Sequence, residues 1–198
     1  MKNIIFGIAM VAIMLTACNS NSNKSPESQN KGNGAQVSSQ KDNATTSSGS
    51  NEKNSSSIKG IVNTYLQLKN AFADDNSTDA ATAGTKLETA FKDFDKTGLT
   101  AVQKKIFDDV EDDAREHAEH IGKNGGNIVH QREHFEMLSK DMYDMVKAFG
   151  GGQILYKVFD SMYNNGKGAF WLSETKEIKN PYMGKAMLTS GTIKEELK

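Results

Sequence analysis

The chain has 198 residues, of which 36% are hydrophobic and 25% are charged, and its 24 basic and 25 acidic side chains give a formal net charge of −1. A chain this close to neutral offers no electrostatic basis for binding nucleic acid. Its single cysteine, Cys18, excludes an internal disulfide framework and a metal site built from several thiolates. The apolar residues are spread unevenly, and they divide the chain into residues 1–17, 18–56 and 57–198.

Residues 1–17 have the pattern of a secretory signal peptide. Lys2 precedes an apolar run from Ile4 to Leu15, which is too short to span a bilayer. The next residues, up to Cys18, resemble a bacterial lipobox, and this resemblance implies that Cys18 is lipidated. We therefore expect a lipid-anchored protein of the cell envelope, facing the periplasm or in the outer membrane; the alternative is an ordinary signal peptide followed by a chance cysteine.

Residues 18–56 are rich in serine and asparagine and contain almost no aliphatic side chains. Such a segment cannot bury enough apolar surface to offset the entropy lost on ordering. We predict a disordered tether between Cys18 and the folded domain at 57–198.

Four amphipathic helices are predicted within residues 57–152, where apolar side chains recur at steps of three and four. Short polar or glycine-rich turns separate these stretches, and no proline lies between Pro26 and Pro181. The expected fold is therefore mainly α, an up-and-down four-helix bundle. The predicted core stripes are Ile58, Ile61, Val62, Tyr65, Leu68 and Phe72; Ala80, Ala83, Leu87, Ala90, Phe91 and Phe94; Leu99, Val102, Ile106, Val110, Ala114, His117 and Ile121; and Ile128, Phe135, Leu138, Met142, Met145 and Phe149.

Residues 153–198 have a different pattern, which predicts a small β-hairpin and an irregular tail. The strands are expected at Leu155–Phe159 and Ala169–Leu172, joined by a turn at Asn164–Gly168. The last residues, Thr192–Leu197, are predicted to form a helical end.

All four histidines fall within 18 residues, at the end of the third predicted helix and the start of the fourth. His117 and His120 are spaced i,i+3, and His130 and His134 are spaced i,i+4, so each pair shares one helical face. A glycine-rich turn between the helices makes them antiparallel neighbours and brings the pairs together. Histidine pairs with this spacing can bind zinc or copper, although buried or solvated histidines would give the same pattern. Carboxylates that could ligate the metal or orient the rings are Glu116, Glu119, Glu133 and Glu136.

Several motifs resemble one family of proteins. The motifs are His130–Phe135, Lys167–Ser173, Glu177–Gly184 and Met187–Thr189. Together they resemble a domain-of-unknown-function family found in Gram-negative bacterial lipoproteins and appended to membrane-fusion proteins of copper and silver efflux systems. The resemblance covers about residues 60–198 and implies copper handling in the periplasm, with no established enzymatic activity.

The same resemblance implies a ligand set, from which this chain departs. His130, His134, Met162 and Met187 match the family pattern, whereas the family commonly has cysteines where this chain has Asp160 and Ser190. Thiolate and thioether ligands select Cu(I), while imidazole and carboxylate suit Cu(II) or Zn(II). The candidate metal ligands are therefore His117, His120, His130, His134, Asp160, Met162 and Met187.

Two functions remain open at this point. One is a membrane-anchored protein that binds copper or zinc and serves metal homeostasis, with an efflux adaptor or another envelope protein as partner. The other is a metal-free structural or interaction lipoprotein that has lost the family's metal site. No nucleophile–base motif, phosphate-binding loop or pair of catalytic carboxylates stands out, so the sequence favours a protein that is not an enzyme.

Overall fold

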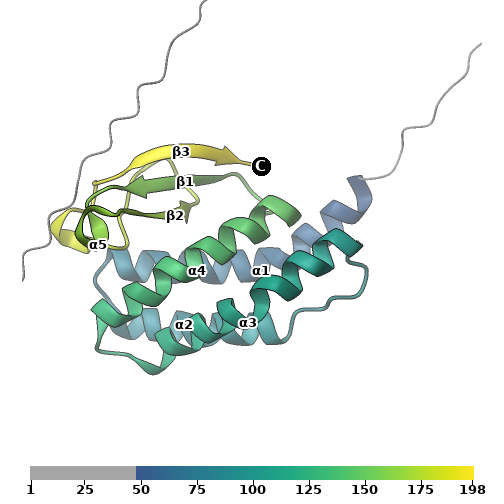
Figure 1. Ribbon diagram of the computed structural model, residues 1–198, viewed down its shortest axis with the longest axis horizontal. Helices are drawn as coiled ribbons and strands as arrows, with labels where there is room; N and C mark the ends of the chain where they lie inside the picture. Colours follow the sequence, from purple (N-terminus) through teal and green to yellow (C-terminus); the bar gives the residue numbers. More distant parts are fainter. Residues whose placement is uncertain (1–47) are drawn as a thin grey trace, which may run out of the picture. The chain divides into compact units, whose positions relative to one another are not determined.

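A computed structural model describes residues 48–198, and the expected signal peptide, Cys18 and most of the expected tether lie outside these described residues. The described part contains four long helices followed by a small sheet (Figure 1). Within it, no helix combines the length and hydrophobicity needed to cross a membrane. The elements are α1 (Ser48–Ala73), α2 (Ser77–Lys92), α3 (Ala101–Lys123), α4 (Ile128–Phe149), β1 (Leu155–Asp160), α5 (Tyr163–Gly166), β2 (Ala169–Ser173), a 3-10 turn η1 (Gly184–Ala186) and β3 (Thr192–Leu197).

The four helices form the predicted bundle. Each helix packs against the next one in the chain, and α1 also contacts α4. The predicted fold class, mainly α with a small C-terminal sheet, is confirmed. The helix α1 begins at Ser48, ahead of residue 57, where the sequence places the start of the first helix.

Polar side chains cap the helices at the short connections. Asn76 accepts the Asp79 N–H at the start of α2, and Thr100 and Gln103 form a capping box at the start of α3. The helix α4 ends at Gly150, whose φ of +75° is accessible to glycine at little cost. These capping residues determine where α2 and α3 begin and where α4 ends.

The helix α3 approaches α2 closely near its C-terminal end. A Cβ atom at Gly84 on α2 would lie 2.9 Å from the Ala118 carbonyl oxygen and 2.9 Å from the Gly122 amide nitrogen on α3. Side chains larger than hydrogen would push the two backbones apart. The glycines therefore set the position of the last turns of α3.

The core follows the predicted stripes on α1, α2 and α4, but the stripe on α3 is partly wrong. Val102 is 69% exposed and Ile106 is only partly buried, whereas Gln103 and Phe107 are buried in their place. The Phe107 ring stacks on Phe94 with 4.3 Å between centroids. A phenylalanine buries more apolar surface than an isoleucine. The helix α3 is therefore turned about its axis, relative to the predicted stripe, so that Phe107 faces the core.

The tail forms a three-stranded antiparallel sheet in the order β2-β1-β3. The predicted hairpin is confirmed, because β1 pairs with β2 from Tyr156–Ser173 to Asp160–Ala169. The predicted helical end at Thr192–Leu197 is wrong, since these residues form β3 and pair with the other edge of β1. Lys194 to Leu197 favour helix by propensity, but pairing with an open strand edge overrides that preference.

The sheet packs on the side of the bundle formed by α1 and α4, away from α2 and α3 (Figure 1). Trp171 on β2 is fully buried in this interface. The Arg132 Nε on α4 donates to the Pro181 carbonyl at 2.7 Å, and its Nη2 donates to Asp75 at 2.6 Å. Lys69 on α1 is buried and pairs with Glu174 at 2.8 Å. The tail is thus attached to the helices by a buried tryptophan and by charged side chains on α1 and α4.

Candidate metal centre

The turn between α3 and α4 brings the histidine-bearing ends of the two helices together. Asn124 Nδ2 donates to the His120 carbonyl at 2.8 Å, which satisfies an oxygen at the end of α3. Asn127 Oδ1 accepts the His130 N–H at 3.3 Å and caps α4. Gly126, with φ of +98°, provides the reversal between them. The predicted antiparallel histidine hairpin is confirmed by this geometry.

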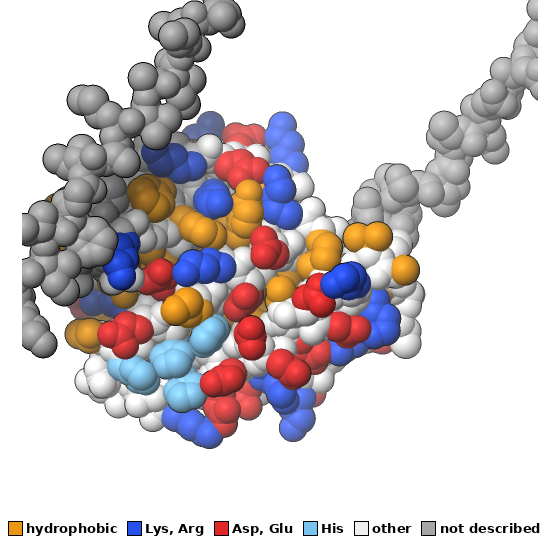
Figure 2. Space-filling view, viewed as in Figure 1, with side chains coloured by type: hydrophobic (Ala, Val, Ile, Leu, Met, Phe, Trp, Pro, Cys, Tyr) orange, Lys and Arg blue, Asp and Glu red, His pale blue; other side chains and the backbone are white. Residues whose placement is uncertain are grey.

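Three histidines form a compact group. One ring nitrogen from each of His120, His130 and His134 lies within 4.8 Å of the other two. The His120 and His134 rings stack with 4.4 Å between centroids, and the His130 ring meets His134 edge-on at 4.6 Å. Figure 2 shows histidine side chains gathered on one face of the molecule, with acidic side chains beside them. We call His120, His130 and His134 the histidine triad.

His117 lies next to the triad without belonging to it. Its Nδ1 is 3.1 Å from the Nδ1 of His134, and the two ring centroids are 5.3 Å apart. An N···N distance of this length is a hydrogen bond in which one ring donates and the other accepts. His117 is therefore coupled to one triad member through a single nitrogen.

Burial keeps the inner histidines neutral. Loss of solvent, followed by repulsion from His120, His117 and His130, lowers the pKa of His134 to about 4. Burial also lowers the pKa of His117. Both rings are consequently unprotonated on one nitrogen near neutral pH, which is the form that binds metal ions.

Carboxylates border the outer two histidines. Glu133 Oε2 is 3.4 Å from His130 Nδ1, and Glu116 Oε1 is 3.8 Å from His120 Nε2. Of the other carboxylates expected nearby, Glu119 pairs with Lys123, and Glu136 accepts from Lys140 at 3.2 Å. Two of the four expected carboxylates therefore lie against histidine rings, where they can orient them.

A tetrahedral zinc ion has nitrogen ligands at about 2.0–2.1 Å, which places the nitrogens about 3.4 Å from one another. The triad nitrogens, within 4.8 Å of one another, would close inward by roughly an ångström to reach this geometry. The stacked His120 and His134 rings would rotate apart as they close. Three imidazoles would leave the fourth position open for water or for a ligand from another molecule.

Asp160, which was expected to join the histidines, is hydrogen-bonded within the tail. Asp160 is 1% exposed, and its Oδ1 accepts the Met162 N–H at 2.6 Å. Its Oδ2 accepts from the Asn180 amide and from Ser190 Oγ, the latter at 3.0 Å. The carboxylate is thus occupied by hydrogen bonds within the tail. We call Asp160, Asn180 and Ser190 the Asp160 network.

The expected methionine ligands flank this network. Met162 is 55% exposed and Met187 is 37% exposed. The Met162 N–H contacts Asp160, and the Met187 carbonyl accepts the Ser190 N–H at 3.0 Å. Asp160 and Ser190 are therefore direct neighbours, linked by a hydrogen bond.

Helix geometry explains why one face of α4 carries triad histidines and another face binds the tail. A step of two residues along an α-helix turns the side chain by about 200°. His130 belongs to the triad, while Arg132 binds Pro181 in the tail. The structure therefore brings together His120, His130 and His134, places His117 beside them, and leaves Asp160, Met162 and Met187 with the tail.

The sequence did not predict a partly buried carboxylate, Asp141, on α4 where it faces α3. Asp141 Oδ2 is buried without a hydrogen-bond partner among the described residues. Burial, followed by repulsion from Asp113 and Asp144, raises the pKa of Asp141 to about 7. Asp141 lies two helical turns after His134, so a helical-period reading of the acidic residues on α4 could have identified it.

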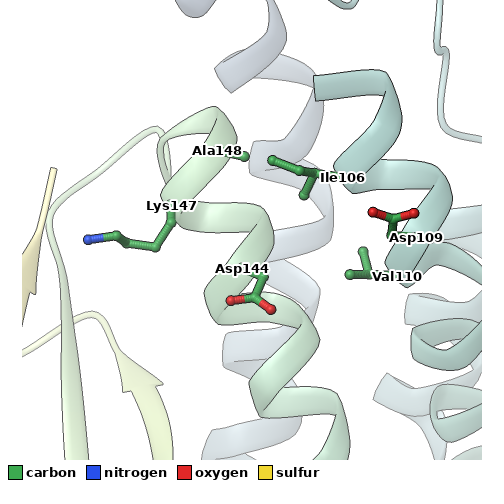
Figure 3. A pocket seen from close by; sticks show the side chains of 6 residues that line it. All are labelled: Ile106, Asp109, Val110, Asp144, Lys147 and Ala148. Carbon is green, nitrogen blue, oxygen red and sulfur yellow. The ribbon is translucent and has the colours of Figure 1, made fainter. Parts of the chain in front are cut away.

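A shallow hollow lies further along the contact between α3 and α4, near the end of α4 (Figure 3). Ile106, Val110 and Ala148 provide its apolar surface, and Asp109 and Asp144 lie beside them. Lys147 points away from the hollow in Figure 3, and its ammonium group pairs with Glu195 on β3 at 2.8 Å. None of the predicted site residues lines this hollow.

One family model matches part of the chain. Residues 61–153 match the family described as "Protein of unknown function (DUF3347)". The matched segment contains the four histidines and ends before β1, so the Asp160 network lies outside it. No curated protein and no solved structure matches the chain. The match over residues 61–153 supports placing the helical bundle in a domain-of-unknown-function family.

Proposed function

We propose that the protein is a lipid-anchored envelope protein whose helical domain binds a zinc or copper(II) ion through the histidine triad. The observation that carries the proposal is the approach of three ring nitrogens, from His120, His130 and His134, to within 4.8 Å of one another. Three imidazoles favour Zn(II) or Cu(II) over Cu(I), which thiolate and thioether ligands select.

The electrostatics of the triad support this proposal. The lowered pKa of His134 keeps that ring unprotonated well below neutral pH, so protons compete weakly with a metal ion for it. Glu133 beside His130 and Glu116 beside His120 add negative charge next to the site. An open fourth position suits a protein that acquires and releases its ion, and we propose binding in metal homeostasis or efflux without an enzymatic reaction.

The test is a metal titration of the untagged chain followed by thermal unfolding. Zinc at about 100 times its dissociation constant should stabilise the fold by about 2.7 kcal/mol. The His130→Ala/His134→Ala double variant should lose this stabilisation, because it removes two of the three ligands. Asp112→Asn, at a side chain that is 87% exposed on α3, is the matched control and should bind as the unaltered chain does.

Unchanged affinity in the double variant would contradict the proposal. It would then favour the alternative, a metal-free interaction protein, which draws support from the fully hydrogen-bonded Asp160 in place of a cysteine ligand. In either case an efflux adaptor or another envelope protein is the proposed partner.

The proposed anchor is tested separately at Cys18. Cys18→Ser removes the thiol that would carry the lipid, and with it a membrane affinity of about 0.8 kcal/mol per buried methylene. We expect this variant to move from the membrane fraction to the soluble fraction when envelopes are separated. Ser22→Ala in the same segment is the control, and retention of Cys18→Ser in the membrane would overturn the lipid anchor.

A further inference from the structure

His117 contacts the histidine triad through one ring nitrogen and lies outside the set of mutually close ligand atoms. We propose that His117 is a positioning residue, which accepts a hydrogen bond from His134 Nδ1 and thereby presents His134 Nε2 to the metal ion. The inference rests on the proposed metal-binding function and changes the role expected for His117 from ligand to support.

The direction of the hydrogen bond follows from counting protons. His134 Nδ1 is engaged with His117 Nδ1 at 3.1 Å, so Nε2 is the His134 nitrogen left for an ion. A nitrogen that binds metal carries no proton, and a neutral imidazole has one proton in total. With an ion on Nε2, the His134 proton sits on Nδ1 and is donated to His117, whose own proton is then on Nε2. Metal-binding histidines commonly donate their second ring N–H in this way.

The position of His117 suits a supporting role. It lies one turn before His120 on α3, between the buried residues Ala114 and Ala118. The close backbone contact at Gly84 holds this part of α3 against α2. The acceptor, His117 Nδ1, therefore lies on a segment that is held in place. Its hydrogen bond favours one tautomer and one orientation of the His134 ring.

The first measurement needs no metal. Long-range ¹H–¹⁵N spectra of the chain with a chelator present report which nitrogen of each ring carries the proton. We expect His134 to carry it on Nδ1, the less common tautomer of free histidine. His117→Ala should return His134 toward the common Nε2–H form. His117→Asn should preserve the Nδ1–H form, because the asparagine oxygen can occupy the place of the histidine Nδ1 and accept the same hydrogen bond.

The second measurement is metal affinity with the ligand set monitored by the visible absorption of Co(II). His117→Ala should weaken Co(II) and Zn(II) binding by about 10- to 100-fold. His117→Asn should restore most of this loss. The Co(II) bands should keep their positions in both variants, because the three ligands are unchanged.

The other possible results would contradict the ligand set, the positioning role or the proposed function, as follows. A changed Co(II) spectrum in His117→Ala would make His117 a ligand. A metal-binding chain with the His134 proton on Nε2, or a failure of His117→Asn to rescue affinity, would overturn the positioning role alone. If the unaltered chain binds none of Zn(II), Co(II) and Cu(II), the proposed function falls and the positioning role falls with it, whatever the tautomer of His134.

Discussion

The histidine triad and the Asp160 network each collect side chains that can ligate a metal, but they differ in how those side chains are used. The triad rings contact one another and exposed carboxylates at the surface of the α3–α4 turn. Asp160 is buried, and it accepts hydrogen bonds from three donors of the tail. Residue type alone does not identify a ligand, because a carboxylate that already accepts three hydrogen bonds must break them to bind an ion.

The largest expected effect on stability comes from Asp160. Asp160→Ala leaves three donors without their acceptor, from Met162, Asn180 and Ser190. We expect a loss of about 3 kcal/mol in the free energy of unfolding, measured by urea denaturation. Zinc affinity at the triad should stay unchanged while the protein remains folded.

The exposed methionines are the matched controls for this variant. Met162→Ala and Met187→Ala should change the free energy of unfolding by less than about 0.5 kcal/mol. A tenfold loss of zinc affinity in any of these three tail variants would contradict the distinction between the two groups, because it would show that the tail and the triad form one site.

A smaller effect, of opposite sign, is expected between α3 and α4, beside the triad. The pKa of Asp141 is raised to about 7 from 3.8, so the folded state favours its protonated form. Its contribution to stability is complete below about pH 4 and is lost as the pH rises to 7. Asp141→Asn stays neutral and should be more stable than the unaltered chain by about 1 kcal/mol at pH 8.

The advantage of Asp141→Asn should shrink steadily between pH 7 and pH 4, as followed by urea denaturation at several pH values. An advantage that does not depend on pH would mean that the carboxylate is solvated. An advantage that does shrink would show that two carboxylates have opposite effects on stability. Asp160, which is hydrogen-bonded, stabilises the tail, whereas Asp141, which lacks a partner on one oxygen, destabilises the contact between α3 and α4.

The sequence predicted the bundle well because helical periodicity is a local signal. The stripe from Phe135 to Phe149 on α4 is buried as expected. On α3, two stripes overlap, and packing against other aromatic rings such as Phe94 selects Phe107 over Ile106. For the strand β3, the decisive partner is β1, more than thirty residues earlier, which local propensity does not register.

The histidine cluster could be predicted from the sequence in part, as the bundle could. Spacing of i,i+3 and i,i+4 with a glycine-rich turn was enough to expect four neighbouring histidines. It could not separate the triad from His117, because that distinction depends on distances of a few ångströms between rings. Nor could it separate His130 from the tail ligands, since the face of α4 on which the tail docks is set by Trp171 and Arg132.

The α3–α4 turn also determines when the triad can assemble. His120 and His134 are fourteen positions apart, whereas Asp160 reaches Ser190 across thirty and Lys69 reaches Glu174 across 105. Contacts between near neighbours in sequence form early in folding, because little chain entropy is lost in closing a short loop. The triad should therefore be complete as soon as α3 and α4 pack together. An ion bound at that stage would cross-link the two helices and stabilise their hairpin before the tail packs on the bundle.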